Sequence, residues 1–179
     1  MTQYFINKDF HPSFEDGTIP KLLYICNVDS THTSLPRAMH MHHDVLEIIF
    51  IKEGSGGHLI GDRHYKTIKG DILIYNSGVL HDEYGNPDTN MSVFCCGITN
   101  LKLSGFPKNH LVSKDSSYVL RSGEYATNIE SLLEMMYSQI SGKNQVQKKH
   151  VVICFVPLLR SFCKFHRRTS YYQNQRNHY

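Results

Sequence analysis

Residues 40–54 read HMHHDVLEIIFIKEG, and this stretch decides how the rest of the 179-residue chain is interpreted. Side chains alternate between the two faces of a β-strand, so His40 and His42 point to the same side. Glu47 has the opposite parity and can join the two histidines only if the chain turns between them. The dipeptide at 43–44 stands where that turn is needed. The spacing therefore predicts a turn followed by a buried strand.

A second stretch, residues 70–81, reads GDILIYNSGVLH and ends on His81. A neighbouring strand would bring His81 to the group formed by His40, His42 and Glu47. Three imidazoles and one carboxylate with open positions left over are suitable ligands for Fe(II), Mn(II), Ni(II) or Zn(II). The two stretches together thus indicate a possible metal site.

The region around these stretches has the pattern of an all-β domain. Between about residues 21 and 122, short apolar runs alternate with turn residues roughly every ten positions, as in antiparallel sandwiches and barrels. Gly61 and Asp62 form a hairpin signal. Residues 1–20 are polar and indicate an N-terminal arm. We predict a β-sandwich or β-barrel domain over residues 21–122.

Residues 123–166 change to a helical period, which predicts a pair of helices. The first helix ends at Gly142, and its apolar stripe consists of Tyr125, Ile129, Leu132, Leu133, Met136 and Ile140. The second, at about 145–164, has two adjacent apolar seams. A double seam favours pairing with a second copy of the chain, although a single wide core face has the same pattern. The predicted dimer interface consists of Val151, Phe155, Leu158 and Phe162.

Composition and charge exclude several classes of protein. The chain has 19 Lys and Arg, 16 Asp and Glu and 12 His. Residues 1–142 carry a net charge of −5, whereas residues 143–179 hold 8 basic and no acidic residues. No stretch has the length of a membrane span or the apolar core of a signal peptide, so we expect a cytoplasmic protein without a membrane partner.

The five cysteines are an odd number and show no CxxC spacing, so we expect reduced thiols. Cys95 and Cys96 are neighbours on a predicted strand and must face opposite sides of it. At most one of them can point into the barrel. We interpret both as inert buried thiols.

The two quoted stretches fit the patterns H-x-H-x4-E-x6-G and G-x5-P-x-G-x2-H, with Asn76 in the place of the proline. These patterns resemble the paired motifs of the cupin superfamily. The resemblance implies a small antiparallel jelly-roll barrel. It also implies that a divalent metal ion, where one is bound, is held by His40, His42, Glu47 and His81.

The order of a barrel, a helix pair and a basic linker at residues 167–179 resembles the N-terminal effector domain of AraC-type bacterial transcription regulators. This resemblance covers about residues 20–166. It implies a mainly β fold, a cupin-type antiparallel jelly-roll barrel followed by two C-terminal α-helices. In that family the barrel holds a small ligand, often a sugar, and the helices pair two subunits. DNA is bound by a C-terminal domain with two helix-turn-helix motifs, which has no counterpart up to Tyr179, so we expect a piece of a longer regulator.

The leading hypothesis is therefore a homodimeric, non-enzymatic sensing domain that binds a small, sugar-like effector inside the barrel. The residues expected to line the effector site are His40, His42, Glu47, His58, Tyr75, His81 and Tyr84. The four motif residues have three open interpretations: metal ligands, polar lining for a metabolite, or structural hydrogen-bonding groups. The alternative function is a metal-dependent cupin enzyme, an isomerase or dioxygenase. A stand-alone sugar-binding cupin is a third.

Overall fold

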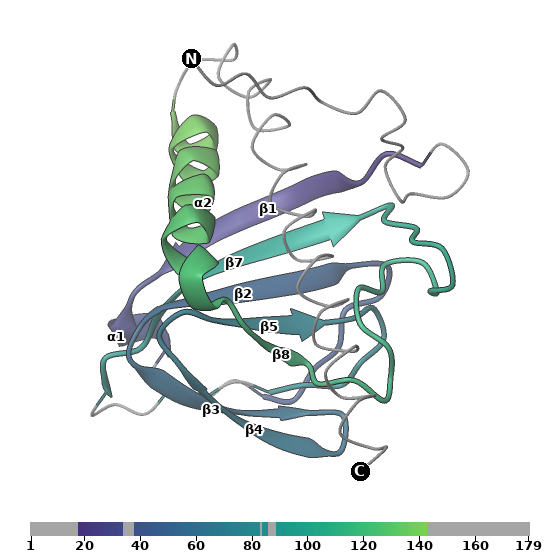
Figure 1. The fold of residues 1–179 in the computed structure, drawn as a ribbon, viewed down its shortest axis with the longest axis horizontal. Coiled ribbons are helices and arrows are strands. Elements are labelled where there is room, and N and C mark those ends of the chain that lie inside the picture. The colour runs from purple at the N-terminus through teal and green to yellow at the C-terminus, as the bar shows by residue number, and fades with distance from the viewer. Residues whose placement is uncertain (1–17, 34–37, 83, 86–88, 143–179) are drawn as a thin grey trace, which may run out of the picture.

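Two antiparallel sheets face each other and enclose the core of the protein (Figure 1). The computed structural model describes residues 18–33, 38–82, 84–85 and 89–142. The strands are β1 (Lys21–Val28), β2 (Leu46–Glu53), β3 (Ser55–Ile60), β4 (Arg63–Ile68), β5 (Asp71–Tyr75), β6 (Tyr84–Gly85), β7 (Ser92–Thr99) and β8 (Val119–Arg121). One sheet has the strand order β1-β7-β2-β5-β8, and the other has the order β4-β3-β6. The predicted antiparallel barrel is confirmed.

Each apolar run of the sequence forms a strand, and the predicted hairpin is present. Strands β3 and β4 pair from Ser55 to Ile68, and the connection consists of Gly61 and Asp62 alone. Gly61 has a φ of 62°, which a two-residue hairpin turn requires and glycine adopts without strain. The sequence did not predict the short helix α1 (Ser30–Thr33) or the two-residue strand β6.

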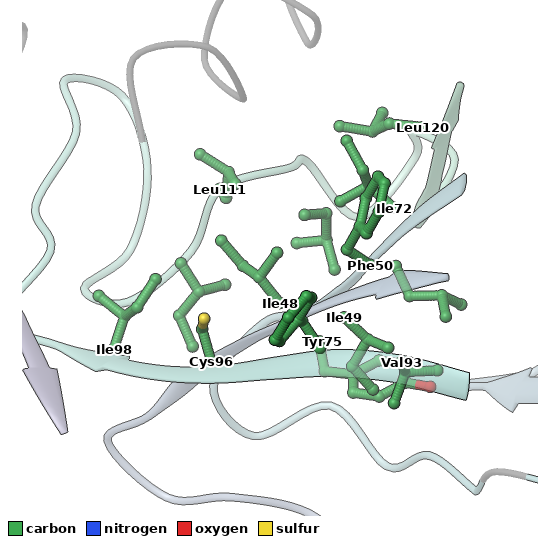
Figure 2. Packing of buried hydrophobic residues seen from close by; sticks show 14 of the residues in the cluster. Ile48, Ile49, Phe50, Ile72, Tyr75, Val93, Cys96, Ile98, Leu111 and Leu120 are labelled. Carbon is green, nitrogen blue, oxygen red and sulfur yellow. The ribbon is translucent and has the colours of Figure 1, made fainter. Parts of the chain in front are cut away.

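Strand β2 lies at the centre of the larger sheet and is buried on both faces from Leu46 to Ile51. On one face, Ile48 pairs with Cys96 of β7, in the apolar cluster shown in Figure 2. On the other face, Glu47 pairs with Tyr75 of β5 and with Gly97 of β7. The same strand therefore separates an apolar layer from a layer that contains a buried carboxylate.

The helix α2 (Ala126–Ser141) follows a 3-10 turn, η3 (Gly123–Tyr125), and lies beside β1 and β7 in Figure 1. Its buried residues are Ile129, Leu133 and Met136, as the apolar stripe predicts. The Tyr137 ring lies 6.2 Å from the ring of Phe94, so α2 covers the apolar face of the sheet. Within the described ranges, no helix is long and apolar enough to cross a membrane.

The predicted second helix and its proposed interface residues Val151, Phe155, Leu158 and Phe162 lie outside the described residues. The same is true of most of the N-terminal arm and of the basic linker at 167–179. Their roles stay predictions. The first helix ends as predicted, because Gly142 has an extended conformation after the last helical turn.

The turn between β2 and β3 requires glycine for two separate reasons. Gly54 has a φ of 73°, which side-chain-bearing residues rarely adopt. A β-carbon on Gly54 would also lie 2.2 Å from the Thr89 carbonyl oxygen and 2.6 Å from the Met91 amide nitrogen. The backbone of the segment just before β7 therefore fills the space that any side chain would need.

We predict that Gly54→Ala destabilises the protein by about 2–5 kcal/mol, because the left-handed conformation and the overpacking add. The matched control is Gly61→Ala, since Gly61 also has a positive φ but a β-carbon there would meet nothing within 4 Å. The control should lose only about 1–2 kcal/mol. Urea unfolding of both variants measures the difference, and equal losses would contradict the close approach at Gly54.

Candidate functional site

A sharp turn before β2 brings Glu47 to the side of the two histidines that precede it. Asp44 has a φ of 60°, so the alternation of side chains is interrupted between His42 and Glu47. The Asp44 amide donates to Ser77 Oγ at 2.9 Å, and its carbonyl accepts from the Asn109 side-chain amide at 2.8 Å. The sequence-based prediction of a turn at 43–44 is confirmed.

A backbone bridge places His81 opposite His40. The His40 amide donates to the His81 carbonyl at 2.9 Å, and the His81 amide donates back at 2.8 Å. His81 also forms a bridge with Ile60 at the end of β3. This double pairing joins the residues before β2 to the smaller sheet. It brings the two motifs together across about forty residues of sequence.

Backbone carbonyls fix the orientation of two of the imidazole rings. His40 Nδ1 lies 2.9 Å from the Ala38 carbonyl, and His81 Nδ1 lies 2.9 Å from the Val79 carbonyl. A carbonyl can only accept, so Nδ1 carries the proton in each ring and Nε2 keeps a free lone pair. The same arrangement orients histidine ligands in metal sites.

The four motif residues converge to form one compact group. Each of His40, His42, Glu47 and His81 offers a ligand atom, and these atoms all lie within 4.8 Å of one another. Glu47 and His81 are buried, whereas His40 and His42 are partly exposed. The group therefore extends from the buried interior toward the protein surface.

Two nitrogen atoms in this group are buried without a hydrogen bond. His42 Nε2 and His81 Nε2 have no hydrogen-bond partner among the residues that the structure describes. They lie 3.2 Å and 3.7 Å from Glu47 Oε2, so the two nitrogens and the carboxylate oxygen face one another. Unsatisfied buried polar atoms are uncommon, and several aimed at one point suit a bound ion. The four residues could therefore hold a divalent metal.

The Glu47 carboxylate is charged despite its burial. Removal from water raises its pKa, but contacts with His81, Cys95 and Tyr24 and the charge of His42 outweigh that effect and lower the pKa to about 2. Glu47 Oε1 accepts hydrogen bonds from Tyr24 Oη at 2.8 Å and from Cys95 Sγ at 2.9 Å. The group therefore contains an ionised carboxylate at neutral pH.

Tyr24 and Cys95 are site residues that the sequence analysis did not identify. Tyr24 belongs to the edge strand β1, and its neighbour across the sheet cannot be deduced from local periodicity. Both cysteines are expected to be buried, but Cys95 is only partly buried, and its thiol donates to Glu47. Of the two, Cys96 is the core thiol, with 1% of its surface exposed. The parity rule predicted that the two thiols face opposite sides, but it could not say which of them faces inward.

Beneath the four-residue group, a second polar layer fills the barrel. The Tyr75 ring stacks on His81 with centroids 3.9 Å apart. Its hydroxyl lies 3.3 Å from His58 Nδ1, and His58 Nε2 lies 2.9 Å from Thr67 Oγ1. Both His58 nitrogens are thus engaged inside the protein. His58 and Tyr75, two of the predicted lining residues, form the floor of the site.

The structure also describes the positions of Tyr84 and Asn76, which the sequence analysis named. Tyr84 belongs to β6, where its backbone pairs with Gly57, while its side chain lies outside the described part of the chain. Asn76, which stands where the cupin motif has proline, accepts from the Leu111 amide at 2.9 Å and donates to the Val112 carbonyl at 2.8 Å. A proline could make neither contact, so Asn76 has a structural role in fixing this loop.

A polar depression of about 580 Å³ lies at the far end of the large sheet, lined in part by Asn27, Lys52 and Thr89. Its lysine donates to Asn27 Oδ1 at 2.8 Å. The depression lies near the end of β2 opposite to Glu47, so it is separate from the four-residue group. The converging imidazoles make that group the stronger candidate site.

Comparison with known proteins identifies the family of the chain. The family model described as AraC-like ligand binding domain matches residues 30–149, more than half of the chain. The chain belongs to this family. The matched range includes all four residues of the group and the helix α2. No curated protein matches this AraC-like domain.

Several solved structures are distantly similar to this AraC-like domain. A Bacillus halodurans protein is 10% identical, with 48% of this chain and 64% of that chain covered and a TM-score of 0.36. Oxalate decarboxylase from Bacillus subtilis, described with Mn(II) centres, is 20% identical over 42% of this chain and 21% of that chain, with a TM-score of 0.32. A cupin protein from Bacteroides fragilis is 16% identical over 59% and 98%, with a TM-score of 0.38. The chain thus spans less than two thirds of the first two proteins.

The buried histidine in the floor predicts a specific acid sensitivity. Burial lowers the pKa of His58 from 6.5 to about 4 in the folded protein. The unfolded chain therefore binds a proton first as the pH falls, so the free energy of unfolding decreases between about pH 6.5 and pH 4. The loss attributable to His58 should reach about 3 kcal/mol at most.

Urea unfolding of His58→Gln at several pH values tests this prediction. The variant should lack the His58 component, so its stability should fall less steeply below pH 6.5 than that of the wild type. His64→Gln is a matched control, because His64 is exposed in the partner strand β4. Equal pH dependence in the wild type and His58→Gln would show that the buried ring is protonated without penalty.

Proposed function

We propose that this chain is the sensing domain of an AraC-type transcription regulator and that its small-molecule effector binds at His40, His42, Glu47 and His81. Family membership supports a ligand-binding role. The observation that carries the location is the convergence of four ligand atoms within 4.8 Å, with two Nε2 atoms unpartnered among the described residues. Sites that bind small molecules commonly contain a few converging polar groups, which is the feature that supports this location.

The group fits a divalent metal ion, and we propose that it holds one. Three imidazoles with one carboxylate suit Fe(II), Mn(II), Ni(II) or Zn(II). The Nδ1 protons of His40 and His81 are directed at backbone carbonyls, which leaves Nε2 of each ring as the ligand atom. When bound, such an ion supplies open coordination positions to oxygen atoms of an effector.

The shape of the site favours a small polar effector, and we propose a sugar-like molecule. The stacked Tyr75 and His81 rings and the His58 layer fill the barrel below the group. We propose that the effector approaches from the side of His40 and His42, because these two residues are partly exposed. Hydroxyl groups suit this environment, since imidazole and carboxylate groups can donate to them or accept from them.

The regulatory output of this proposal depends on parts of the protein beyond the described residues. A cytoplasmic homodimer would form through the seam of Val151, Phe155, Leu158 and Phe162, and DNA would be bound by a separate helix-turn-helix domain. The effector shifts such a regulator only if it binds two conformations with different affinity. In this proposal the chain is not an enzyme.

The second candidate is a metal-dependent cupin enzyme, an isomerase or dioxygenase. One observation favours it: the ligand atoms of His40, His42, Glu47 and His81 lie within 4.8 Å of one another and could hold a metal ion. A sensor releases its ligand unchanged, whereas an enzyme converts it. NMR spectra of a bound ligand recovered after long incubation with metal-loaded protein separate the two functions.

We predict that untagged wild-type protein contains about one divalent metal ion per chain and that His81→Ala and His40→Ala lose it. Each substitution removes one of four ligands from a site where the remaining groups cannot replace it. Elemental analysis by plasma mass spectrometry measures the content. His64→Ala, on exposed strand β4, should keep the metal. A wild type that stays metal-free after exposure to all four ions would refute the metal proposal.

We also predict that a member of a panel of pentoses, hexoses and hydroxy acids raises the melting temperature. A ligand at a hundred times its Kd stabilises the native state by about 2.7 kcal/mol. The shift should disappear in His42→Ala, which removes a partly exposed member of the group, and persist in His64→Ala. A shift of equal size in both variants would place the effector elsewhere.

A further inference from the structure

The two carboxylate oxygens of Glu47 have different surroundings. Oε1 accepts from Tyr24 Oη at 2.8 Å and from Cys95 Sγ at 2.9 Å. Oε2 instead lies 3.2 Å from His42 Nε2 and 3.7 Å from His81 Nε2. One oxygen is thus occupied by two donors from the sheet, and the other faces the imidazoles.

We propose that Tyr24 and Cys95 are positioning residues that hold Oε1, so that Glu47 presents Oε2 alone to a bound metal ion. This inference rests on the proposed metal at the four-residue group. A carboxylate can bind a metal through one oxygen or through both. Two hydrogen bonds to Oε1 oppose the rotation that would bring both oxygens to the ion. The protein then contributes four ligand atoms, and the remaining positions stay open to the effector.

Tyr24 reaches Glu47 across an intervening strand. In the register of the sheet, Tyr24 on β1 pairs with Gly97 on β7, and Gly97 pairs with Glu47 on β2. A β-carbon at position 97 would lie 2.2 Å from Cε1 of the Tyr24 ring. The ring therefore lies directly over Gly97, and its hydroxyl extends to Glu47. Glycine is required here for space, because any side chain would displace the ring.

Cys95 approaches the same oxygen from a neighbouring position on β7. It pairs with Ile49 of β2, two residues after Glu47, so both side chains lie on the same face of the sheet. The next residue, Cys96, lies on the opposite face in the apolar core. Cys96 is thus a matched control for Cys95, with the same chemistry and strand but without contact to the carboxylate.

The experiment titrates the 179-residue chain with Co(II), whose visible d–d bands lose intensity as the coordination number rises. Tyr24→Phe keeps the ring over Gly97 and removes only the hydroxyl, and Cys95→Ala removes the thiol. We expect each variant to bind Co(II) about 10- to 100-fold more weakly, as is typical when a group that orients a ligand is lost. We also expect weaker d–d bands, because the released carboxylate binds through both oxygens.

Further variants separate positioning from a general loss of structure. Cys95→Ser retains a donor and should restore the wild-type spectrum. Cys96→Ala and Tyr137→Phe alter the apolar side of the sheet and should leave both the affinity and the spectrum unchanged. Gly97→Ala should reproduce the effect of Tyr24→Phe, and it should have no further effect on Co(II) affinity in a Tyr24→Ala background, where no ring remains to be displaced.

The outcomes distinguish this inference from the function on which it rests. Altered spectra in Tyr24→Phe and Cys95→Ala, with rescue by Cys95→Ser, support the positioning role. Wild-type spectra in both variants overturn the positioning role, even if the affinity for Co(II) changes. That result leaves the proposed metal site unaffected. Absence of Co(II) binding by the wild type overturns both the metal proposal and this inference.

Discussion

A buried, ionised carboxylate in the middle of the central strand is the constraint on which the site depends. An isolated charge inside a protein is costly unless it is paired and hydrogen-bonded. Glu47 has 6% of its surface exposed, and its two oxygens are surrounded by a phenol, a thiol and two imidazoles. These partners come from β1, β7 and the segments before β2 and after β5. Compensating one charge therefore requires the correct pairing of most of the large sheet.

The two sides of β2 serve different purposes. The apolar side carries Phe50, which pairs with Phe94 beneath the Tyr137 ring of α2. The polar side carries Glu47 and the group around it. A displacement of β2 on effector binding would thus be transmitted by direct packing to the helix that precedes residues 143–179. Such a path allows coupling, but coupling itself requires two conformations of different effector affinity.

Much of the fold could be predicted from the sequence, because it is encoded in local patterns. The apolar runs, the hairpin at Gly61 and the stripe of α2 depend only on side-chain periodicity and turn chemistry. The four motif residues could also be identified, since one turn is enough to bring Glu47 to His40 and His42, and the resemblance to the paired cupin motifs adds His81. Tyr24 and Cys95 could not, because their contacts depend on which strands pair and in which register. That register is a property of the folded sheet and cannot be deduced from the sequence next to Tyr24 or Cys95.

The contact between Tyr24 and Gly97 has a consequence for how this domain can vary in evolution. The two residues are 73 positions apart in sequence, but the Tyr24 ring occupies the space that a side chain at position 97 would need. A chain that gains a side chain at position 97 must first lose the aromatic ring at position 24, and an aromatic residue can arise at 24 only where 97 is already glycine. The two positions are expected to covary among related domains. The pair would distinguish members in which a tyrosine hydroxyl donates to this carboxylate from members that lack this hydrogen bond.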